Sequence, residues 1–393
     1  MKSEWTLKKL SEIADFNPRE SLRKGTVAKK VGMDKLQPFC RDIPFYELEA
    51  YTGGTKFRNG DTIMARITPC LENGKTAKVN ILEEGEIGFG STEYIVFRAK
   101  EGVDEDFLYY LVCSSIIREP AIKSMVGSSG RQRVQTDVVE NLDIAVPSYE
   151  EQHLIGRILR NLDDKIKINN KINENLEQQA QAYFDKLFVA NADPNWPECT
   201  LSDVGSIVAG GTPSKSKVEY YTDHGIAWIT PKDLSVDKSK FISHGENDIS
   251  ELGLTKSSAT KMPVGTVLFS SRAPIGYIAI AQNEVTTNQG FKSVIPNENI
   301  GTAYVYFLLK NLLPTIEGMA SGSTFKEISG AGMKSVPTVM PDTDTIQLFR
   351  SFCEPLFKEQ EVLEAENKHL SALRDSLLPK LMSGEIDVSE LDL

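Results

Sequence analysis

Arginine, lysine and amide side chains occur in short loops that appear twice along the sequence. The stretch NGDTIMARITP contains Arg66, and VGTVLFSSRAPIG contains Arg272 at nearly the matching place. Arg, Lys, Asn and Gln have donor groups that match guanine and adenine edges in the DNA major groove, while Ser, Thr and Lys position phosphates. These loops therefore indicate contact with DNA.

Two further loops repeat in the same order with different contents. GFGSTEYIVF corresponds to TTNQGFKSVIP, and GSSGRQRVQ corresponds to SGSTFKEIS. Any single polar residue is explained equally well by a solvated loop. Loops that recur at the same positions in both copies but carry different polar residues favour DNA binding. The candidate DNA-binding residues are Arg66, Thr68, Ser91, Thr92, Arg131, Gln132, Arg133, Thr212, Ser214, Lys215, Lys232, Arg272, Asn288, Gln289, Lys292, Thr324 and Lys326.

The common catalytic constellations are missing from the sequence. There is no Asn/Asp-Pro-Pro-aromatic methyltransferase signature and no G-x-S-x-G nucleophile turn, and LENGKTA lacks the first glycine of a phosphate loop. The four histidines show no H-x-x-x-H spacing, which argues against a metal site. We therefore expect no catalytic residue, no metal and no cofactor in this chain, and predict a binding protein rather than an enzyme.

The composition is typical of a multidomain globular protein. The 393 residues exceed one ordinary domain, and 40% of them are hydrophobic. The net charge of -11 is unusual for a DNA-binding chain, but the last 51 residues contain 5 basic and 11 acidic groups, so a DNA-binding face can be local. Five widely spaced cysteines argue against disulfides, and no apolar run suits a signal or membrane span, so we expect a cytoplasmic protein.

The sequence contains an internal duplication. Residues 148–189 align with residues 342–383 without a gap, at an offset of 194 that places Leu154 on Leu348. The same offset continues upstream into a strand-like stretch, NLDIAVPS opposite SVPTVMPD, which chance matching of two amphipathic helices does not explain. Two units of about 190 residues follow, each with a globular part of about 145 residues and a long helical segment.

Both helical segments show a heptad pattern, and each helix would be roughly 50 Å long, more than a domain of this size buries. Each therefore needs a partner helix, and the nearest is the other copy. A two-fold relation between the copies makes the pair antiparallel, with Asn173 opposite Asn367. The alternative is that each helix packs on its own domain.

The predicted helix-pair interface consists of apolar residues at the ends and asparagines in the middle: Ile155, Leu159, Leu162, Ile166, Asn173, Leu176, Leu187, Leu356, Leu363, Asn367, Leu370, Leu377 and Leu381. At one end we expect Leu377, Leu378 and Leu381 to pack around Ile155 and Leu159. Gly384 is expected to end the second helix.

Several motifs resemble one known family. They are GGTPSK, IAWITPKDL and NQGFKSVIP in the second unit, the Pro-x-x-x-x-Gln-x-x-Ile entry to the first helix at residues 147–155, and the ending SLLPKLMSGEI. The combination covers essentially the whole chain and resembles the specificity (S) subunit of type I restriction-modification systems. The first unit lacks GGTP and WITPKDL, as expected of domains that read different half-sites.

The residues and the resemblance together predict an α+β fold, with two similar globular α/β-mixed target recognition domains separated by two long antiparallel coiled-coil helices in a pseudo-two-fold repeat. The expected division is target recognition domain 1 at residues 1–147, the first spacer helix and linker at 148–192, target recognition domain 2 at 193–341, and the second spacer helix and tail at 342–393.

The resemblance implies that each domain reads one half of a bipartite, asymmetric DNA site and that the helix pair sets the spacer. It implies double-stranded DNA, two modification (methyltransferase) subunits and restriction (motor/nuclease) subunits as partners, and no membrane. S-adenosylmethionine, ATP and Mg²⁺ are expected in those subunits. The alternative function is a duplicated scaffold that binds protein or carbohydrate, and a steep loss of affinity with salt would distinguish DNA binding from it.

Overall fold

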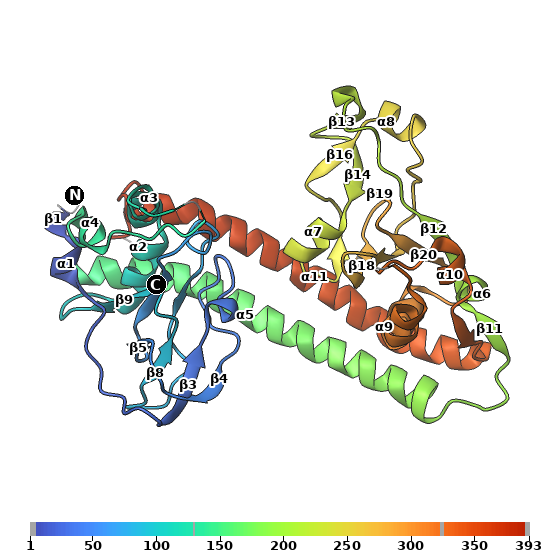
Figure 1. Cartoon of the computed structure of the whole chain (residues 1–393), viewed down its shortest axis with the longest axis horizontal. Coiled ribbons are helices and arrows are strands. Elements are labelled where there is room, and N and C mark those ends of the chain that lie inside the picture. Colours follow the sequence, from blue (N-terminus) through green and yellow to red (C-terminus); the bar gives the residue numbers. More distant parts are fainter. Residues whose placement is uncertain (1–4, 129, 323–325, 390–393) are drawn as a thin grey trace. The chain divides into compact units, whose positions relative to one another are not determined.

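The computed structural model describes residues 5–128, 130–322 and 326–389. The chain divides into two compact units, of which unit 1 is Met1–Lys167 with Asn367–Leu393 and unit 2 is Ile168–Glu366 (Figure 1). Both division points fall inside the long helices α5 (Tyr149–Asp185) and α11 (Thr343–Met382). Each unit therefore contains one globular part and one part of each long helix.

The strands of unit 1 form small sheets. One has the order β2-β9-β6-β7 (Ala14–Phe16, Tyr94–Ala99, Thr62–Ala65, Thr76–Lys78), a second has the order β4-β3-β8-β5 (Glu47–Ala50, Val27–Val31, Gly88–Gly90, Thr55–Phe57), and β1 (Thr6–Lys9) pairs with β10 (Asp143–Val146). The helices are α1 (Leu10–Ile13), η1 (Met33–Lys35), α2 (Glu105–Cys113), α3 (Ser115–Lys123) and α4 (Thr136–Glu140). The larger core lies among α2, β9 and the two long helices.

Unit 2 has a larger set of strands. One sheet has the order β12-β20-β17-β18-β15 (Gly205–Ala209, Lys292–Pro296, Val267–Ser271, Ile275–Ala281, Phe241–Ile242), a second has the order β13-β16-β14-β19 (Tyr221–Thr222, Asn247–Ile249, Ile226–Ile229, Val285–Thr287), and β11 (Glu198–Thr200) pairs with β21 (Pro337–Val339). The helices are η2 (Lys186–Ala190), α6 (Leu201–Val204), η3 (Val218–Tyr220), α7 (Pro231–Val236), α8 (Glu251–Thr255), α9 (Thr302–Met319) and α10 (Gly330–Lys334).

Strand pairing in the two units confirms the predicted duplication and the α+β class. The antiparallel order β2-β9-β6-β7 matches β12-β20-β17-β18, and β1 with β10 matches β11 with β21. Each unit also contains short parallel pairs, β3 with β8 in unit 1 and both β14 with β19 and β15 with β18 in unit 2. In Figure 1 the sheet containing β13, β14 and β16 lies farther from α11 than the sheet containing β12, β18 and β20.

Each long helix begins at a side-chain cap. Ser148 and Glu151 form a reciprocal capping pair before α5, and Asp342 accepts the backbone N–H of Thr345 at 2.8 Å before α11. These groups satisfy amide hydrogens that have no partner inside the helix. Both starts coincide with the prediction from the aligned sequences.

The two helices run antiparallel, as predicted. In unit 1, Ile155 and Leu159 of α5 lie in the same core as Leu381 of α11, near its end. In unit 2, Tyr183 near the end of α5 stacks against Phe349 near the start of α11, with ring centroids 6.1 Å apart. Both helices also pack on the globular part of each unit. The antiparallel pair and the alternative of helices packed on globular domains therefore occur together.

The register of the pair differs from the predicted alignment of Asn173 with Asn367. In unit 2 the Gln360 side chain donates to the backbone carbonyl of Asn173 at 3.1 Å, and Asn169 donates to Glu366 at 2.7 Å. Asn173 therefore faces Gln360, seven residues before its predicted partner. The prediction assumed that the polar centres of the two copies match symmetrically, whereas the side chains that meet between the helices are Gln360 with the Asn173 carbonyl and Glu366 with Asn169.

The end of α11 packs where the sequence placed it. Leu377, Leu378 and Leu381 lie in one cluster with Ile155 and Leu159. Gly384 follows the helix with φ of +69°, a conformation that glycine adopts without steric cost. Residues 384–388 then continue beside Trp5, and Val388 is buried in the same core.

Across the part of the chain that the structure describes, no helix has the length and apolarity needed to cross a membrane.

Candidate nucleic-acid interface

Three loops that contain candidate residues meet in unit 1: the turn after β6 (residues 66–69), the turn between β8 and β9 (residues 91–93), and the loop at residues 126–133. The backbone N–H of Arg66 donates to the carbonyl of Glu93 at 2.9 Å, and that of Thr68 donates to the carbonyl of Gln132 at 3.0 Å. Arg133 forms backbone bridges with both Ile67 and Val126. Backbone hydrogen bonds therefore hold the three loops together.

An ion pair joins two of these loops. Both carboxylate oxygens of Glu93 accept from Nε of Arg133, at 3.0 and 2.9 Å, and one of them also accepts from Nη2 at 2.6 Å. The hydrogen bonds from Arg133 hold the pKa of Glu93 below its usual range. The guanidinium of Arg66 instead turns inward, where Nη2 donates to the carbonyl of Val134 at 3.2 Å.

The other candidates of unit 1 have simpler environments. The Thr68 hydroxyl donates to Glu72 at 3.0 Å, and the Ser91 hydroxyl accepts the backbone N–H of Glu93 at 3.1 Å. Thr92 and Arg131 are exposed, and Gln132 is half-buried. These positions suit phosphate contacts as well as base contacts.

Equivalent loops meet in unit 2. The backbone N–H of Ser271 donates to the carbonyl of Gly290 at 2.7 Å, and Ile328 donates to the carbonyl of Ser271 at 3.1 Å. The loop at residues 210–215 joins them through Gly211, whose N–H donates to Thr287 at 2.8 Å. A Cβ at position 210 would overlap the carbonyl of Asn288, so a glycine is required for this approach.

Polar side chains of unit 2 contact each other across these loops. Glu327 lies between Arg272, whose Nη1 is 3.3 Å away, and Lys292, whose ammonium is 3.5 Å away. Lys292 is buried and also approaches the hydroxyl of Ser271 at 3.4 Å. Thr212 hydrogen-bonds Gln289, which links the glycine-rich loop to the β19–β20 loop.

The remaining candidates of unit 2 lie at the edge of the loop cluster or outside it. Lys232, at the start of α7, forms an exposed ion pair with Glu246 at 2.6 Å, and Ser214 hydrogen-bonds Ser216. Lys215 and Lys326 are exposed, and Asn288 is half-buried. The predicted candidate Thr324 lies outside the described residues.

The loops of the two units correspond with a one-residue shift that the sequence did not reveal. Backbone bridges pair Ile67 with Arg133 in unit 1 and Arg272 with Glu327 in unit 2. Arg272 therefore occupies the position of Ile67, not the position of Arg66, and Glu327 occupies the position of Arg133. The sequence-based candidates were chosen for cationic and amide side chains, so Glu93 and Glu327 were not among them. The available signal was the opposite charge at aligned positions, where Arg133 of unit 1 matches Glu327 of unit 2.

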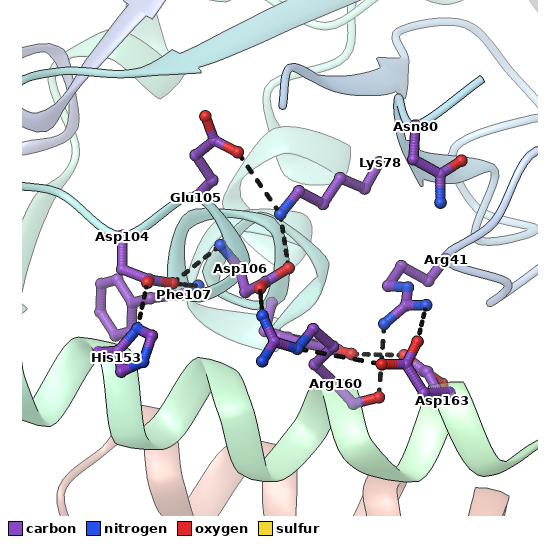
Figure 2. A network of polar contacts seen from close by, with 12 residues as sticks. Arg41, Lys78, Asn80, Asp104, Glu105, Asp106, Phe107, His153, Arg160 and Asp163 are labelled. Atoms are coloured by element: carbon purple, nitrogen blue, oxygen red, sulfur yellow. Dashed lines mark hydrogen bonds and ion pairs between the residues drawn. The ribbon is translucent and has the colours of Figure 1, made fainter. Parts of the chain in front are cut away.

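A charged network connects the globular part of unit 1 to α5 (Figure 2). Asp104 bonds His153 at 2.9 Å, and Asp106 accepts from Lys78 at 2.5 Å and from Arg160 at 2.9 Å. Figure 2 shows His153 and Arg160 extending from α5 toward the two aspartates at the start of α2. The network joins the start of α2 and Lys78 of β7 to the helix.

The same surface of α5 has a second, buried polar group. Asp163 is 7% exposed and accepts from the Tyr110 hydroxyl at 2.6 Å and from Arg374 of α11 at 2.7 Å. Burial is the main reason that the pKa of Tyr110 lies well above its ordinary value. Arg41 adds a contact at the helix surface, where it donates to Asp164 at 2.5 Å.

Unit 2 uses one buried lysine at the corresponding junction. Lys240 donates to Glu177 of α5 at 2.6 Å and to Gln360 of α11 at 2.8 Å, and its ammonium lies 3.4 Å from the ring centroid of Phe357. Burial lowers the pKa of Lys240 to about 8. The carbonyl of Lys240 accepts from β18 as the carbonyl of Arg41 accepts from β7, so the two cations are equivalent.

Comparison with known proteins gives the same assignment over most of the chain. The model of the type I restriction modification DNA specificity domain matches residues 2–178 and again residues 194–370. The specificity subunit of the type I restriction enzyme MjaIX of Methanocaldococcus jannaschii is 35% identical over 46% of this chain and 44% of that protein, so the match spans less than half of that relative. The specificity subunit of the HindI enzyme of Haemophilus influenzae is 25% identical over 84% of this chain and 87% of its own length.

A solved structure shares the fold. The crystal structure of the type I restriction-modification S subunit from M. genitalium matches with a TM-score of 0.61 and 17% identity over 96% of both chains. The relatives are specificity subunits, the non-catalytic components of type I restriction systems, and this confirms the prediction that the chain is no enzyme. With the family model matched twice, once in each half, this chain belongs to the family of type I restriction-modification DNA specificity subunits.

Proposed function

We propose that each unit of this DNA specificity subunit binds one half of a bipartite, asymmetric DNA site through its loop cluster. The observation that supports this most strongly is the pair of loop clusters at equivalent places in the duplicated fold, with the same backbone bridges and different side chains. Two half-sites of different sequence require the same backbone arrangement with different base-reading side chains.

The helix pair is proposed to set the distance between the half-sites. Helix α5 has 37 residues, so it is roughly 55 Å long, and a turn of DNA is about 34 Å. Half-sites one or more turns apart fit this length. The capped starts of both helices and the charged contacts of His153 and Arg160 along α5 suit a stiff element rather than a flexible linker.

Partner subunits are proposed to supply the chemistry. Two modification subunits would bind the two similar surfaces that the duplication provides, and restriction subunits would join them in the cytoplasm. S-adenosylmethionine, ATP and Mg²⁺ would belong to those subunits. This division is supported by the sequence, in which the searched catalytic and metal-binding motifs are missing.

Methylation mapping tests the proposal directly. Cells that express this chain with its modification subunits should show one split motif, and exchange of residues within one unit should change one half of that motif only. A continuous motif, or changes in both halves from one exchange, would contradict the assignment of one half-site to each unit.

A salt titration separates DNA binding from the scaffold alternative. The purified complex with modification subunits should lose affinity for DNA steeply as salt rises, in proportion to the phosphates contacted. A scaffold that binds protein or carbohydrate would show a shallow response, and that result would favour the alternative.

A further inference from the structure

We propose that Arg133 reads a guanine in the half-site bound by unit 1, and that Glu93 is the positioning residue that orients it. The inference rests on the proposed function, and it names one base-reading side chain and the base that this side chain recognises. Arg133 is one of several cationic candidates in these loops, and Glu93 was not predicted from the sequence.

Arg133 lies on a fixed piece of backbone. Its N–H donates to the carbonyl of Val126 at 2.9 Å, and Val126 donates back to the carbonyl of Arg133 at 3.0 Å. A bridge to Ile67 holds the other side. Because a base-reading side chain must be placed within a fraction of an ångström, this anchoring favours Arg133 over a residue at a free loop tip.

The contact with Glu93 uses one edge of the guanidinium and leaves another free. Glu93 accepts from Nε and Nη2, while Nη1 donates to none of the residues that the structure describes. The end of the group, formed by Nη1 and the outer hydrogen of Nη2, has the spacing of guanine O6 and N7. The Arg133 side chain is 46% exposed, so this end is accessible.

Glu93 is itself held by its neighbours. Its N–H donates to the Ser91 hydroxyl at 3.1 Å, and its carbonyl accepts from the Arg66 backbone at 2.9 Å. A half-exposed ion pair adds little to folding stability. Its advantage lies in binding, because an arginine that is already ordered loses less conformational entropy when it meets a base.

The other cations of these loops fit base reading less well. Arg66 uses Nη2 on the carbonyl of Val134, and its Nε is buried. Arg131 is exposed and makes no side-chain hydrogen bond to the described residues, which suits a phosphate contact. In Arg133, Glu93 holds the Nε–Nη2 edge of the guanidinium, and the Nη1–Nη2 end stays available for a base.

The test couples a protein change to a base change. Methylation mapping first defines the two half-sites. The complex of this chain with its modification subunits is then titrated with duplexes in which each guanine of the unit 1 half-site is replaced by 7-deazaguanine, which pairs normally but lacks the N7 acceptor. With the natural chain, one replacement should weaken binding roughly tenfold or more.

The variants should remove that sensitivity. With Arg133→Ala the same replacement should cause less than a twofold further loss, and with Glu93→Gln the sensitivity should fall severalfold. Glu93→Asp, which keeps the charge, should recover part of it. Arg133→Lys keeps the charge and the stem without the fork and should behave like Arg133→Ala, which covers the case in which the alanine variant does not assemble.

Matched controls identify other causes. Glu119→Gln changes an exposed glutamate of unit 1 that forms an ion pair with Lys123, and should leave the sensitivity intact. Guanines of the unit 2 half-site should respond equally in all variants. A loss of affinity that is uniform over all duplexes would make Arg133 a phosphate contact and overturn the proposal, as would full sensitivity in Arg133→Ala or a unit 1 half-site without guanine.

The proposed function fails by a different result. If the natural complex binds DNA without a split motif, the assignment of half-sites to units is wrong. If the split motif is present and Arg133→Ala leaves every guanine response unchanged, only the role of Arg133 and Glu93 is wrong.

Discussion

At the junction of helix pair and globular part, unit 1 has a buried polar group at positions where unit 2 has apolar residues. Asp163 and Arg374 align with Phe357 and Ala180 at the offset of 194, and Tyr110 corresponds to Phe307. The first set forms a buried hydrogen-bonded group, whereas the second lies in an apolar cluster. One backbone frame therefore accepts two different chemistries, provided that all members of a set change together.

The comparison teaches why each set is kept whole. A buried ion pair adds little over well-packed apolar residues, but the loss of one partner leaves an uncompensated charge. Removal of one ring from an aromatic cluster is destabilising for a different reason, because it leaves a cavity and the neighbouring side chains lose packing contacts. Breaking either set should therefore damage one unit and leave the other unchanged.

The largest effect is expected in the apolar cluster of unit 2, which contains Phe307, Phe349 and Phe357. Phe349→Ala removes a fully buried ring that contacts Phe184, Phe188 and Phe307, and should lower the free energy of unfolding of unit 2 by about 3–5 kcal/mol. Denaturant unfolding followed by Trp228, with the other tryptophans replaced by phenylalanine, measures it. An equal loss in unit 1, followed by Trp5, would show that the two sets are not independent.

The polar set should be nearly as sensitive to the loss of one member. Arg374→Ala leaves Asp163 buried without its cation, and should cost unit 1 about 3 kcal/mol. The triple change Tyr110→Phe, Asp163→Phe and Arg374→Ala installs the residues of unit 2 and should recover most of that loss. Asp375→Ala, which removes the exposed partner of Arg374, serves as the control and should change the stability little.

The two equivalent cations should differ in their response to pH. Burial lowers the pKa of Lys240 to about 8 from an ordinary value of 10.5, so between these values the unfolded chain holds the proton more tightly than the folded chain. The contribution of Lys240 to stability should therefore rise by about 3 kcal/mol from pH 8 to pH 10.5.

Comparison with Lys240→Met isolates this contribution. The variant cannot titrate at this position, so the difference in melting temperature between the natural chain and the variant should grow in favour of the natural chain as the pH rises. Arg41 in unit 1 stays protonated throughout this range. A difference that is constant with pH would contradict the titration of Lys240.

The smallest effects are expected in the loops. Arg272→Ala should relax one position of the unit 2 half-site, at a cost of about 1–3 kcal/mol in discrimination. Arg66→Ala should relax the unit 1 half-site less, because its guanidinium is directed to the carbonyl of Val134. Methylome sequencing of both variants measures the change, and unaltered motifs in both would remove these arginines from the base-reading residues.

The sequence predicted those features that depend on periodicity. The duplication, the α+β class, the antiparallel helices and the packing of Leu381 near Ile155 all follow from a repeated pattern of apolar residues. The register did not follow, because it depends on which side chains meet between the helices, as Gln360 meets the carbonyl of Asn173.

The loop contacts could be predicted only in kind. The residue types indicated DNA, but the side chain that pairs with another depends on backbone bridges between distant segments, as between Ile67 and Arg133. A match of letters placed Arg272 nearly opposite Arg66, whereas the bridges place it at the position of Ile67. Carboxylates such as Glu93 were not among the candidate residues, because hydrogen-bond donors are the groups expected to contact DNA.

The division of the chain has a consequence for its synthesis on the ribosome. Unit 2 is one continuous segment, Ile168–Glu366, but unit 1 needs Asn367–Leu393 in addition to its first 167 residues. Leu381, Met382 and Val388 are buried in a core whose other members include Leu10 and Phe107. The half that leaves the ribosome first therefore completes its core last, and must wait exposed while the second half is made.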